Sequence, residues 1–323
     1  MIPGRPVRIR PTQAQFWRRR LVAGLILVAV VALVVFGARE VGAGGSSGAT
    51  KTKAAHQPIL PPPPNEPGGG RTLFPSHRLV AFYGTPGLPT LGVLGNAPPE
   101  QLWSQLASAA APYARPGTTL VPSYELIAYA AEASPGSTGD YSLRLPDAQI
   151  DAYLKVVRAH GGMLILDIQP GLSNLLADAK TLAPWLRQPD VGLALDPEWE
   201  LSAGQRPGRV IGHTTGGEIN QISGWLAQLT TAGRLPEKLL LIHQFNRAMV
   251  EDKPAIAAQP NLALTFNMDG FGKPTNKASV YSLLAADPRW HLGYKLFYQR
   301  DVSLQAPSDV LGLTPPPDVV EYG

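Results

Sequence analysis

The 323-residue chain contains no cysteine. Disulfide bonds and a lipid-modified N-terminal cysteine are therefore excluded. Any folded domain must be stable through its hydrophobic core alone. The C-terminal part, of roughly 250 residues, is large enough for this, since a chain of that size buries about three quarters of its surface on folding.

Several common catalytic motifs are also absent. The chain has no Gly-x-Ser-x-Gly elbow, no phosphate-binding loop and no His-Glu-x-x-His pair, and no Gly-x-Gly-x-x-Gly follows the first expected strand. These absences argue against a serine hydrolase, a nucleotide-binding enzyme and a zinc protease. We predict no cofactor and no metal; a site formed by His243, Asp196 and Asp269 is the remaining metal alternative.

Positive charge is scarce outside the N-terminal tail. Six arginines and no acid lie within the first 20 residues, whereas residues 71–323 carry 19 basic and 22 acidic residues. The net charge of +4 therefore belongs to the tail. A body with a slight excess of acid argues against nucleic acid as a partner.

A single long apolar run comes after this tail. Residues 21–37 are uninterrupted by charge, at the short end of the roughly 17–25 residues that cross a bilayer. The arginines before the run should stay in the cytoplasm. We therefore predict a basic cytoplasmic tail over residues 1–20 and a single-pass signal anchor over 21–37, inserted in the cell membrane with the rest extracytoplasmic. The alternative is a signal peptide cleaved near residues 41–43, which would release a secreted protein.

Residues 38–70 differ in composition from the C-terminal part of the chain. They are rich in Gly, Ala, Ser and Pro, with four consecutive prolines at 61–64 and three glycines at 68–70. Such a segment has too little apolar area to form a core, and its prolines favour an extended chain. We predict a disordered linker that holds the C-terminal domain away from the lipid surface.

Residues 71–323 alternate between short apolar strands and amphipathic helices. Helices are expected over 100–113, 147–160, 173–186, 218–232 and 277–286, and strands over 79–83, 119–124, 163–168, 191–196, 239–243, 262–268 and 292–298. Nearly continuous apolar strands between helices indicate a parallel sheet covered by helices. In one domain of this size they predict an α/β fold, a (β/α)8 TIM-like barrel, with a doubly wound open sheet as the alternative.

The eighth strand of this barrel is not evident. Seven strand–helix units are clear, so the eighth is expected either within residues 301–313 or as a degenerate unit.

Polar residues gather where the expected strands end, which is where loops of a barrel build binding sites. We predict that these residues form one rim and bind substrate together. They are Tyr83, Tyr124, Glu125, Asp167, Trp199, His243, Asn267, Asp269 and Tyr298, with Gln169, Gln244, Asn246, Lys295 and Gln299 at neighbouring strand ends and Phe271 as a further aromatic.

The most informative segment is Val191–Glu200, which reads VGLALDPEWE. It is an apolar strand that delivers two acids, Asp196 and Glu198, two residues apart. Side chains at that spacing on a strand point to the same face, so both carboxyl groups should project into one cleft. The alternative is that Asp196 anchors a loop and Glu198 is solvated.

The segment Gly192–Trp199 resembles the fourth-strand motif of barrel glycoside hydrolases, namely the chitinase-like and cell-wall muramidase-like families, which place an Asp-x-Glu there. The residues 267–269, Asn-Met-Asp, resemble the polar segment after the sixth strand of those barrels. Chitinase-like enzymes have two further aspartates upstream, where this chain has Val191 and Ala194. The tyrosine beside the sixth-strand aspartate and the eighth-strand tryptophan are not found here.

An acidic pair of this kind suits glycoside hydrolysis. One protonated carboxyl group donates to the leaving oxygen, while a second stabilises or attacks the charge at the anomeric carbon. We predict Glu198 as the acid/base. Asp196 is predicted to be the nucleophile or to orient a substrate group that is, with Glu125, Asp167 and Asp269 in reserve. The sequence therefore predicts a membrane-anchored glycoside hydrolase acting on a cell-envelope or extracellular glycan. The alternative is a non-catalytic barrel that binds a glycan or an envelope partner.

Overall fold

The computed structural model describes residues 61–323. The predicted cytoplasmic tail, the signal anchor and the linker as far as residue 60 lie outside the described residues. Between residues 61 and 323, none of the helices combines the length and apolar character that crossing a membrane requires.

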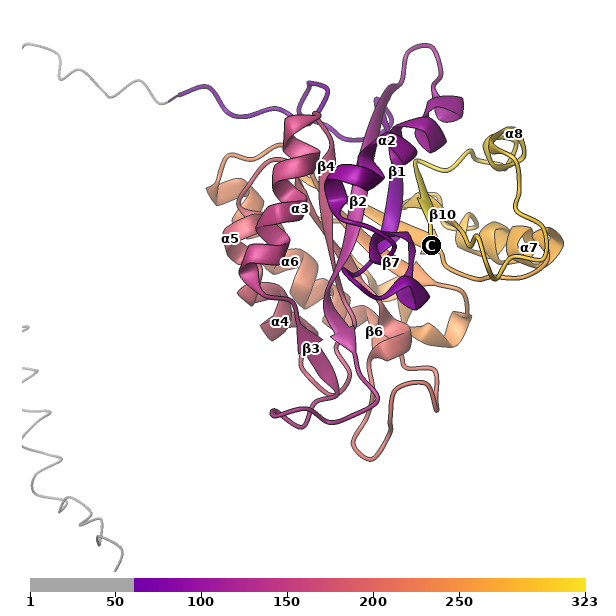
Figure 1. The fold of residues 1–323 in the computed structure, drawn as a ribbon. Coiled ribbons are helices and arrows are strands. Elements are labelled where there is room, and N and C mark those ends of the chain that lie inside the picture. The colour runs from indigo at the N-terminus through magenta and orange to yellow at the C-terminus, as the bar shows by residue number, and fades with distance from the viewer. Residues whose placement is uncertain (1–60) are drawn as a thin grey trace, which may run out of the picture. The chain divides into compact units, whose positions relative to one another are not determined.

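Eight parallel strands form a closed barrel (Figure 1). In chain order they are β1 (His77–Gly84), β2 (Thr119–Ala131), β4 (Met163–Ile168), β5 (Val191–Leu195), β7 (Lys238–Gln244), β9 (Leu262–Met268), β10 (His291–Leu296) and β11 (Val319–Tyr322). Each strand pairs with its neighbour in the chain, and β11 returns to pair with β1. The predicted (β/α)8 TIM-like barrel is confirmed.

Helices cover the outside of the barrel, with α3, α5 and α6 on one side of Figure 1 and α7 on the other. They are α2 (Pro99–Ala110), α3 (Asp147–Ala159), α4 (Leu175–Thr181), α5 (Ala183–Leu186), α6 (Gly216–Ala232), α7 (Pro274–Leu284) and α8 (Pro307–Leu311). Helix α6 begins with a capping box: the Thr215 hydroxyl accepts the Glu218 N–H, and the Glu218 carboxylate accepts the Thr215 N–H. The pair satisfies amide groups that the first helical turn leaves free.

Three short strands lie in the connections: β3 (Ser142–Arg144) pairs antiparallel with β2, and β6 (Thr214–Thr215) pairs with β8 (Val250–Glu251). The β7-to-β9 connection consists of β8 and two 3-10 turns, Arg247–Met249 and Lys253–Ala255.

The alternation of side chains along each strand separates two cores. Outward residues pack against the helices, whereas inward residues such as Leu79, Val121, Ile165 and Leu241 fill the N-terminal half of the barrel. This apolar plug closes one end of the cylinder. Inward positions nearer the C-terminal ends of the strands are left for polar groups.

The location predicted for the eighth strand is wrong. Residues 301–313 contain α8, and the strand is β11, which begins only at Val319. Strand β11 was not recognised from the sequence because it has only four residues and comes after three consecutive prolines, Pro315–Pro317. Such a run favours turns.

The first described residues belong to the barrel domain. The compact unit begins at Pro61. The Arg71 guanidinium donates to the Pro64 carbonyl at 2.7 Å, and Glu66 is buried. Residues 61–70 therefore belong to the same compact unit as the barrel, although six of them are exposed.

Candidate active site

Each of the eight barrel strands contributes a polar, inward side chain near its C-terminal end. Every second residue of a strand faces inward, so these polar side chains follow the inward apolar ones along each strand. The residues, in strand order, are Tyr83, Glu125, Asp167, Asp196, His243, Asn267, Lys295 and Glu321, with Asp196 and the further acid Asp269 directly following their strands.

A cavity of about 470 Å³ opens above this layer. Ten of the predicted residues line it: Tyr83, Gln169, Asp196, Glu198, Trp199, Asp269, Phe271, Lys295, Tyr298 and Gln299. Glu125, Asp167, His243 and Asn267 are fully buried and are not among the residues that line the cavity.

Three acids meet in the cavity. Carboxylate oxygens of Asp196, Glu198 and Asp269 lie within 4.8 Å of one another. The predicted convergence of Asp196 and Glu198 is therefore observed, but the strand spacing invoked for it is wrong. Strand β5 ends at Leu195, and Pro197–Trp199 form a 3-10 turn. A hydrogen bond of 3.1 Å from the Trp199 N–H to the Asp196 carbonyl closes that turn.

Asp196 is a buried carboxyl group with no cation beside it in the described residues. Its side chain is 1% exposed, and Gln169 Nε2 donates to its Oδ2 at 3.3 Å. Its Oδ1 has no hydrogen-bond partner within residues 61–323. Burial, followed by the charge of Glu198, raises the pKa of Asp196 well above its usual value. Both effects favour the protonated form of this carboxyl group.

Glu198 is poised between its two protonation states. It is partly buried, and burial, followed by the charge of Asp269, raises its pKa to about 7. A carboxyl group with this pKa can donate a proton at neutral pH and take it back.

Asp269 is held as a charged group. Lys295 Nζ lies 3.2 Å from its Oδ1, and His243 Nδ1 lies 3.0 Å from its Oδ2. Burial acts to raise the pKa of Asp269, but Lys295 and His243 outweigh it, and the net pKa is lowered. Two adjacent carboxyl groups with opposite shifts are the arrangement that acid–base catalysis uses.

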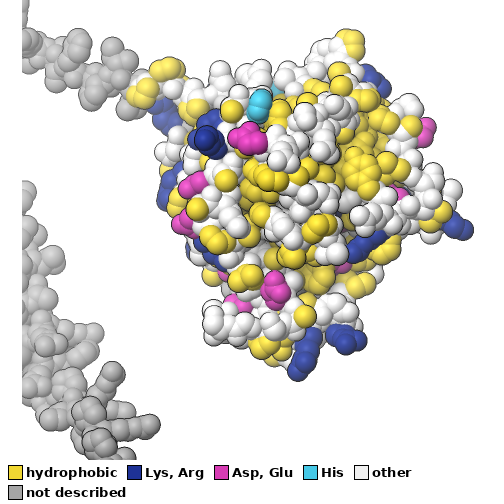
Figure 2. Space-filling view, viewed as in Figure 1, with side chains coloured by type: hydrophobic (Ala, Val, Ile, Leu, Met, Phe, Trp, Pro, Cys, Tyr) yellow, Lys and Arg dark blue, Asp and Glu magenta, His cyan; other side chains and the backbone are white. Residues whose placement is uncertain are grey.

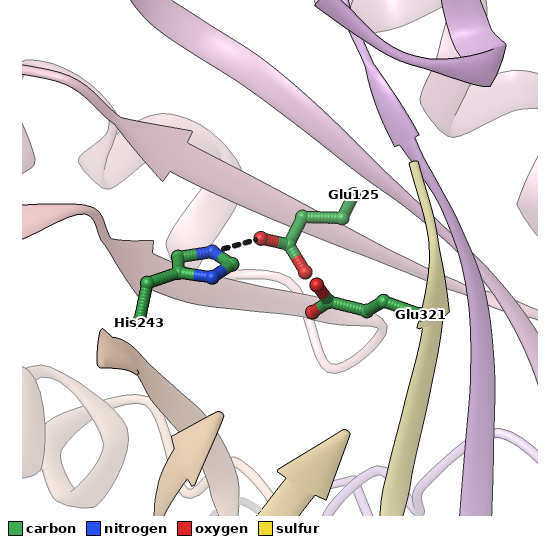
Figure 3. A group of neighbouring side chains, drawn as sticks. All are labelled: Glu125, His243 and Glu321. Carbon is green, nitrogen blue, oxygen red and sulfur yellow. Dashed lines mark hydrogen bonds and ion pairs between the residues drawn. The ribbon is translucent and has the colours of Figure 1, made fainter. Parts of the chain in front are cut away.

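A second cluster, Glu125, His243 and Glu321, lies in the fully buried layer of the barrel (Figure 3). His243 Nε2 lies 2.7 Å from Glu125 Oε1, and Asn267 Nδ2 donates to Glu321 Oε2 at 2.8 Å. The free oxygen of Glu125 faces the Glu321 carboxyl group. Burial, then the charge of Glu125, raises the pKa of Glu321, which favours a proton shared between these two groups.

Both acidic clusters offer ligand atoms close enough to hold a metal ion. The ammonium group of Lys295 lies between them, 3.2 Å from Asp269 and 3.7 Å from Glu321. This ammonium group supplies the acids with the positive charge that a metal ion would bring.

Tyr83 and Asp167 lie between the cavity and the fully buried cluster of Glu125, His243 and Glu321. The Tyr83 hydroxyl donates to Asp167 Oδ2 at 3.2 Å, and Lys295 Nζ lies 3.3 Å from the centre of the Tyr83 ring. Burial raises the pKa of Asp167 to about 7. This cation–π contact holds the Tyr83 ring against the ammonium group of Lys295, which also contacts Asp269.

The prediction that Tyr124 binds substrate is wrong. Its hydroxyl donates to the Pro99 carbonyl at 2.7 Å, and its ring packs edge-on against Trp103. Tyr124 is one residue before the inward Glu125, so the alternation of the strand turns it outward into the helical layer.

The sequence missed one acid of the site, Glu321. It lies on β11, the strand that was not recognised, two residues after the inward Val319. Gln169 and Lys295 were recognised as strand-end residues, but nothing in the sequence showed that they contact Asp196 and Asp269. The sequence feature that could have identified Glu321 is an acid at an inward position within an apolar tetrapeptide.

The raised pKa of Asp196 predicts a pH-dependent gain in stability for Asp196→Asn. The unfolded aspartate ionises near pH 4 and the folded one at higher pH, so the free energy of unfolding of the wild type falls as pH rises from 4 through the folded pKa. Asn does not titrate, so the advantage of the variant should grow by about 1 kcal/mol per pH unit over that interval. Urea unfolding at pH 5 and pH 8 tests this. Exposed Asp147→Asn serves as the control, and an equal effect at both pH values would contradict the assignment.

Comparisons with known proteins find remote structural likeness only. No family model matches the chain, and no curated protein is similar to it in sequence. A GH5 xyloglucan-specific endo-beta-1,4-glucanase from a metagenomic library has a TM-score of 0.40 at 11% identity, over 71% of this chain and 79% of that one. A candidate alpha-L-fucosidase from Bacteroides thetaiotaomicron has 0.39 at 10%, over 86% and 91%. The fold assignment rests on the strand pairings of the chain itself.

Proposed function

We propose that this protein hydrolyses glycosidic bonds in a cell-envelope or extracellular glycan, with Glu198 as the general acid. The observation that carries the proposal is the pairing at the cavity. Glu198, with a pKa of about 7, lies within 4.8 Å of carboxyl oxygens of Asp196 and Asp269. A proton donor beside a second carboxyl group is what cleavage of a glycosidic bond requires.

The walls of the cavity suit a sugar ring. Trp199, Phe271, Phe297 and Tyr298 line it, and flat aromatic rings provide apolar faces beside polar groups. On the face seen in Figure 2, acidic side chains are few among hydrophobic and uncharged ones, whereas the cavity gathers three acids.

Tyr298 is one of the exposed aromatic side chains of the cavity wall, and we propose that it stacks on substrate. It is 47% exposed, and its ring stacks on Tyr322 at 5.2 Å. Tyr298→Ala should raise KM by roughly 2- to 10-fold with little change in kcat, because stacking contributes about 0.5–1.5 kcal/mol. Tyr298→Phe keeps the ring and should stay near wild type. A loss in kcat with unchanged KM would contradict a binding role.

We also propose that residues 21–37 anchor the protein in the membrane and place the barrel outside. The arginines before this run support that orientation. Protease added to intact cells should digest the barrel, and the membrane-bound chain should retain its N-terminus. A soluble chain that begins after residues 41–43 would instead support a cleaved signal peptide.

The proposed hydrolysis of glycosidic bonds is tested with the full chain, purified in detergent, on a panel of envelope and extracellular polysaccharides. New reducing ends with wild type, and their loss with Glu198→Gln, are expected. Retention of a glycan without new reducing ends would contradict the proposal and support the non-catalytic barrel.

A further inference from the structure

The geometry assigns the second catalytic carboxylate to Asp269 rather than Asp196, with His243 and Lys295 as the positioning residues that hold it ionised. This inference rests on the proposed function and goes beyond it, because it names the group that faces the anomeric carbon.

The first reason is the charge that the barrel can hold. Two basic side chains, His243 and Lys295, lie among these acids in the inward layer of the barrel. Lys277 and Arg300 also line the cavity, but Lys277 pairs with Asp301 and Arg300 is exposed to solvent. Full ionisation of the acids would leave four negative charges without a counter-charge, a state that a buried site does not support. Below neutral pH two of the acids are therefore charged, since Glu198 and Asp167 ionise only near pH 7. The six acids are Glu125, Asp167, Asp196, Glu198, Asp269 and Glu321.

The positions of the cations decide which two acids are charged. His243 has carboxylates on both ring nitrogens, Glu125 at 2.7 Å and Asp269 at 3.0 Å. An imidazole between two carboxylates donates to both of them as the imidazolium. Lys295 adds a second cation at 3.2 Å from Asp269. Glu125 and Asp269 are therefore the ionised pair.

Only one member of this pair can reach a substrate. Asp269 lines the cavity and is 7% exposed, whereas Glu125 is fully buried. Asp196 also lines the cavity, but its contact is the neutral amide of Gln169 at 3.3 Å. Asp196 therefore lacks the counter-charge that a carboxylate at this position needs.

The reaction is set by this arrangement. Asp269 attacks the anomeric carbon as the bond to the leaving oxygen breaks, and that oxygen takes the proton of Glu198. Water then attacks the same carbon, gives a proton to Glu198 and releases Asp269. The separation of less than 4.8 Å between Glu198 and Asp269 oxygens is closer to the roughly 5–5.5 Å of retaining pairs than to the 6.5–9.5 Å of inverting pairs. We therefore expect retention at the anomeric carbon.

The charge assignment is tested without substrate, by NMR of the full chain in detergent with 13C-labelled aspartate carboxyl groups. The signals are assigned by their loss in Asp269→Asn and Asp196→Asn. Asp269 should show the shift of a carboxylate from pH 8 down to pH 4, and Asp196 that of a carboxylic acid at pH 6. A protonated Asp269 or an ionised Asp196 at pH 6 overturns the inference.

A separate measurement tests the catalytic role. On a glycan that wild type cleaves, Asp269→Ala should lower kcat/KM by at least about 100-fold. The loss in kcat/KM for Asp196→Asn should be at least tenfold smaller than that for Asp269→Ala. Azide should restore turnover to Asp269→Ala as a glycosyl azide of inverted configuration. A larger loss in Asp196→Asn, or no azide adduct, overturns the assignment. If no glycan is cleaved by wild type, the proposed function fails while the NMR result still decides the charge state.

Discussion

Glu198→Gln is expected to lower kcat/KM by about 100- to 10,000-fold on a natural glycan, the usual contribution of a positioned general acid. Gln keeps the shape of the side chain in the turn but has no proton to give. The loss should be small for an aryl glycoside whose leaving group departs without protonation. Comparing the two substrates separates loss of acid catalysis from loss of folding.

Glu200→Gln is the matched control for this variant. Glu200 is two residues away and partly buried, but it is not among the residues that line the cavity. It should therefore keep wild-type activity. Equal losses in the two variants, or equal losses on both substrates, would contradict the acid role of Glu198.

The pH dependence of the wild-type enzyme is governed by the same group. The pKa of Glu198 is raised to about 7 and the protonated form is active, so kcat/KM should fall as pH rises through 7, about tenfold per unit beyond it. The pKa of Asp269 is lowered, so activity should persist down to about pH 4. Activity that rises between pH 6 and pH 8 would contradict the assignment.

Lys295→Met is expected to be the most destabilising substitution, by about 3–5 kcal/mol at pH 7, because it leaves buried carboxyl groups without their counter-charge. Lys295 is 1% exposed and lies within 4 Å of Asp269 and Glu321. Met is of similar length and apolar, so the volume is largely kept. Urea unfolding of the two proteins gives the difference in free energy of unfolding.

Lys155→Met on α3 is the control, since Lys155 is exposed. It should change stability by less than about 0.5 kcal/mol. If Lys295→Met behaves like this control, the buried charge network does not depend on Lys295, and the ionised state of Asp269 loses its main support.

The sequence predicted the architecture well because near-continuous apolar strands have few other uses. Its error with β11 arose from length, since four residues such as Val319–Tyr322 are too few to show a period. Its error with Tyr124 arose from the strand boundary: β2 continues to Ala131, so Tyr124 is in mid-strand, where alternation decides its direction.

The acids of the site were largely identified from the sequence, but their charges were not. Asp196 and Glu198 were chosen by their spacing, and Asp269 was only a reserve candidate. Protonation depends on which cation lies beside each acid. Lys295 on β10 and His243 on β7 reach Asp269 because both strands pair with β9, a relation that no local pattern contains.

The most direct test of this account is the titration of Glu198 in the full chain, monitored by NMR of 13C-labelled glutamate carboxyl groups. The signal is identified by its loss in Glu198→Gln. A midpoint near pH 7 is expected, at which Glu198 holds a proton ready for the leaving oxygen. A midpoint near 4.5, the usual value for glutamate, would show that Glu198 is ionised at neutral pH and would contradict its role as the acid.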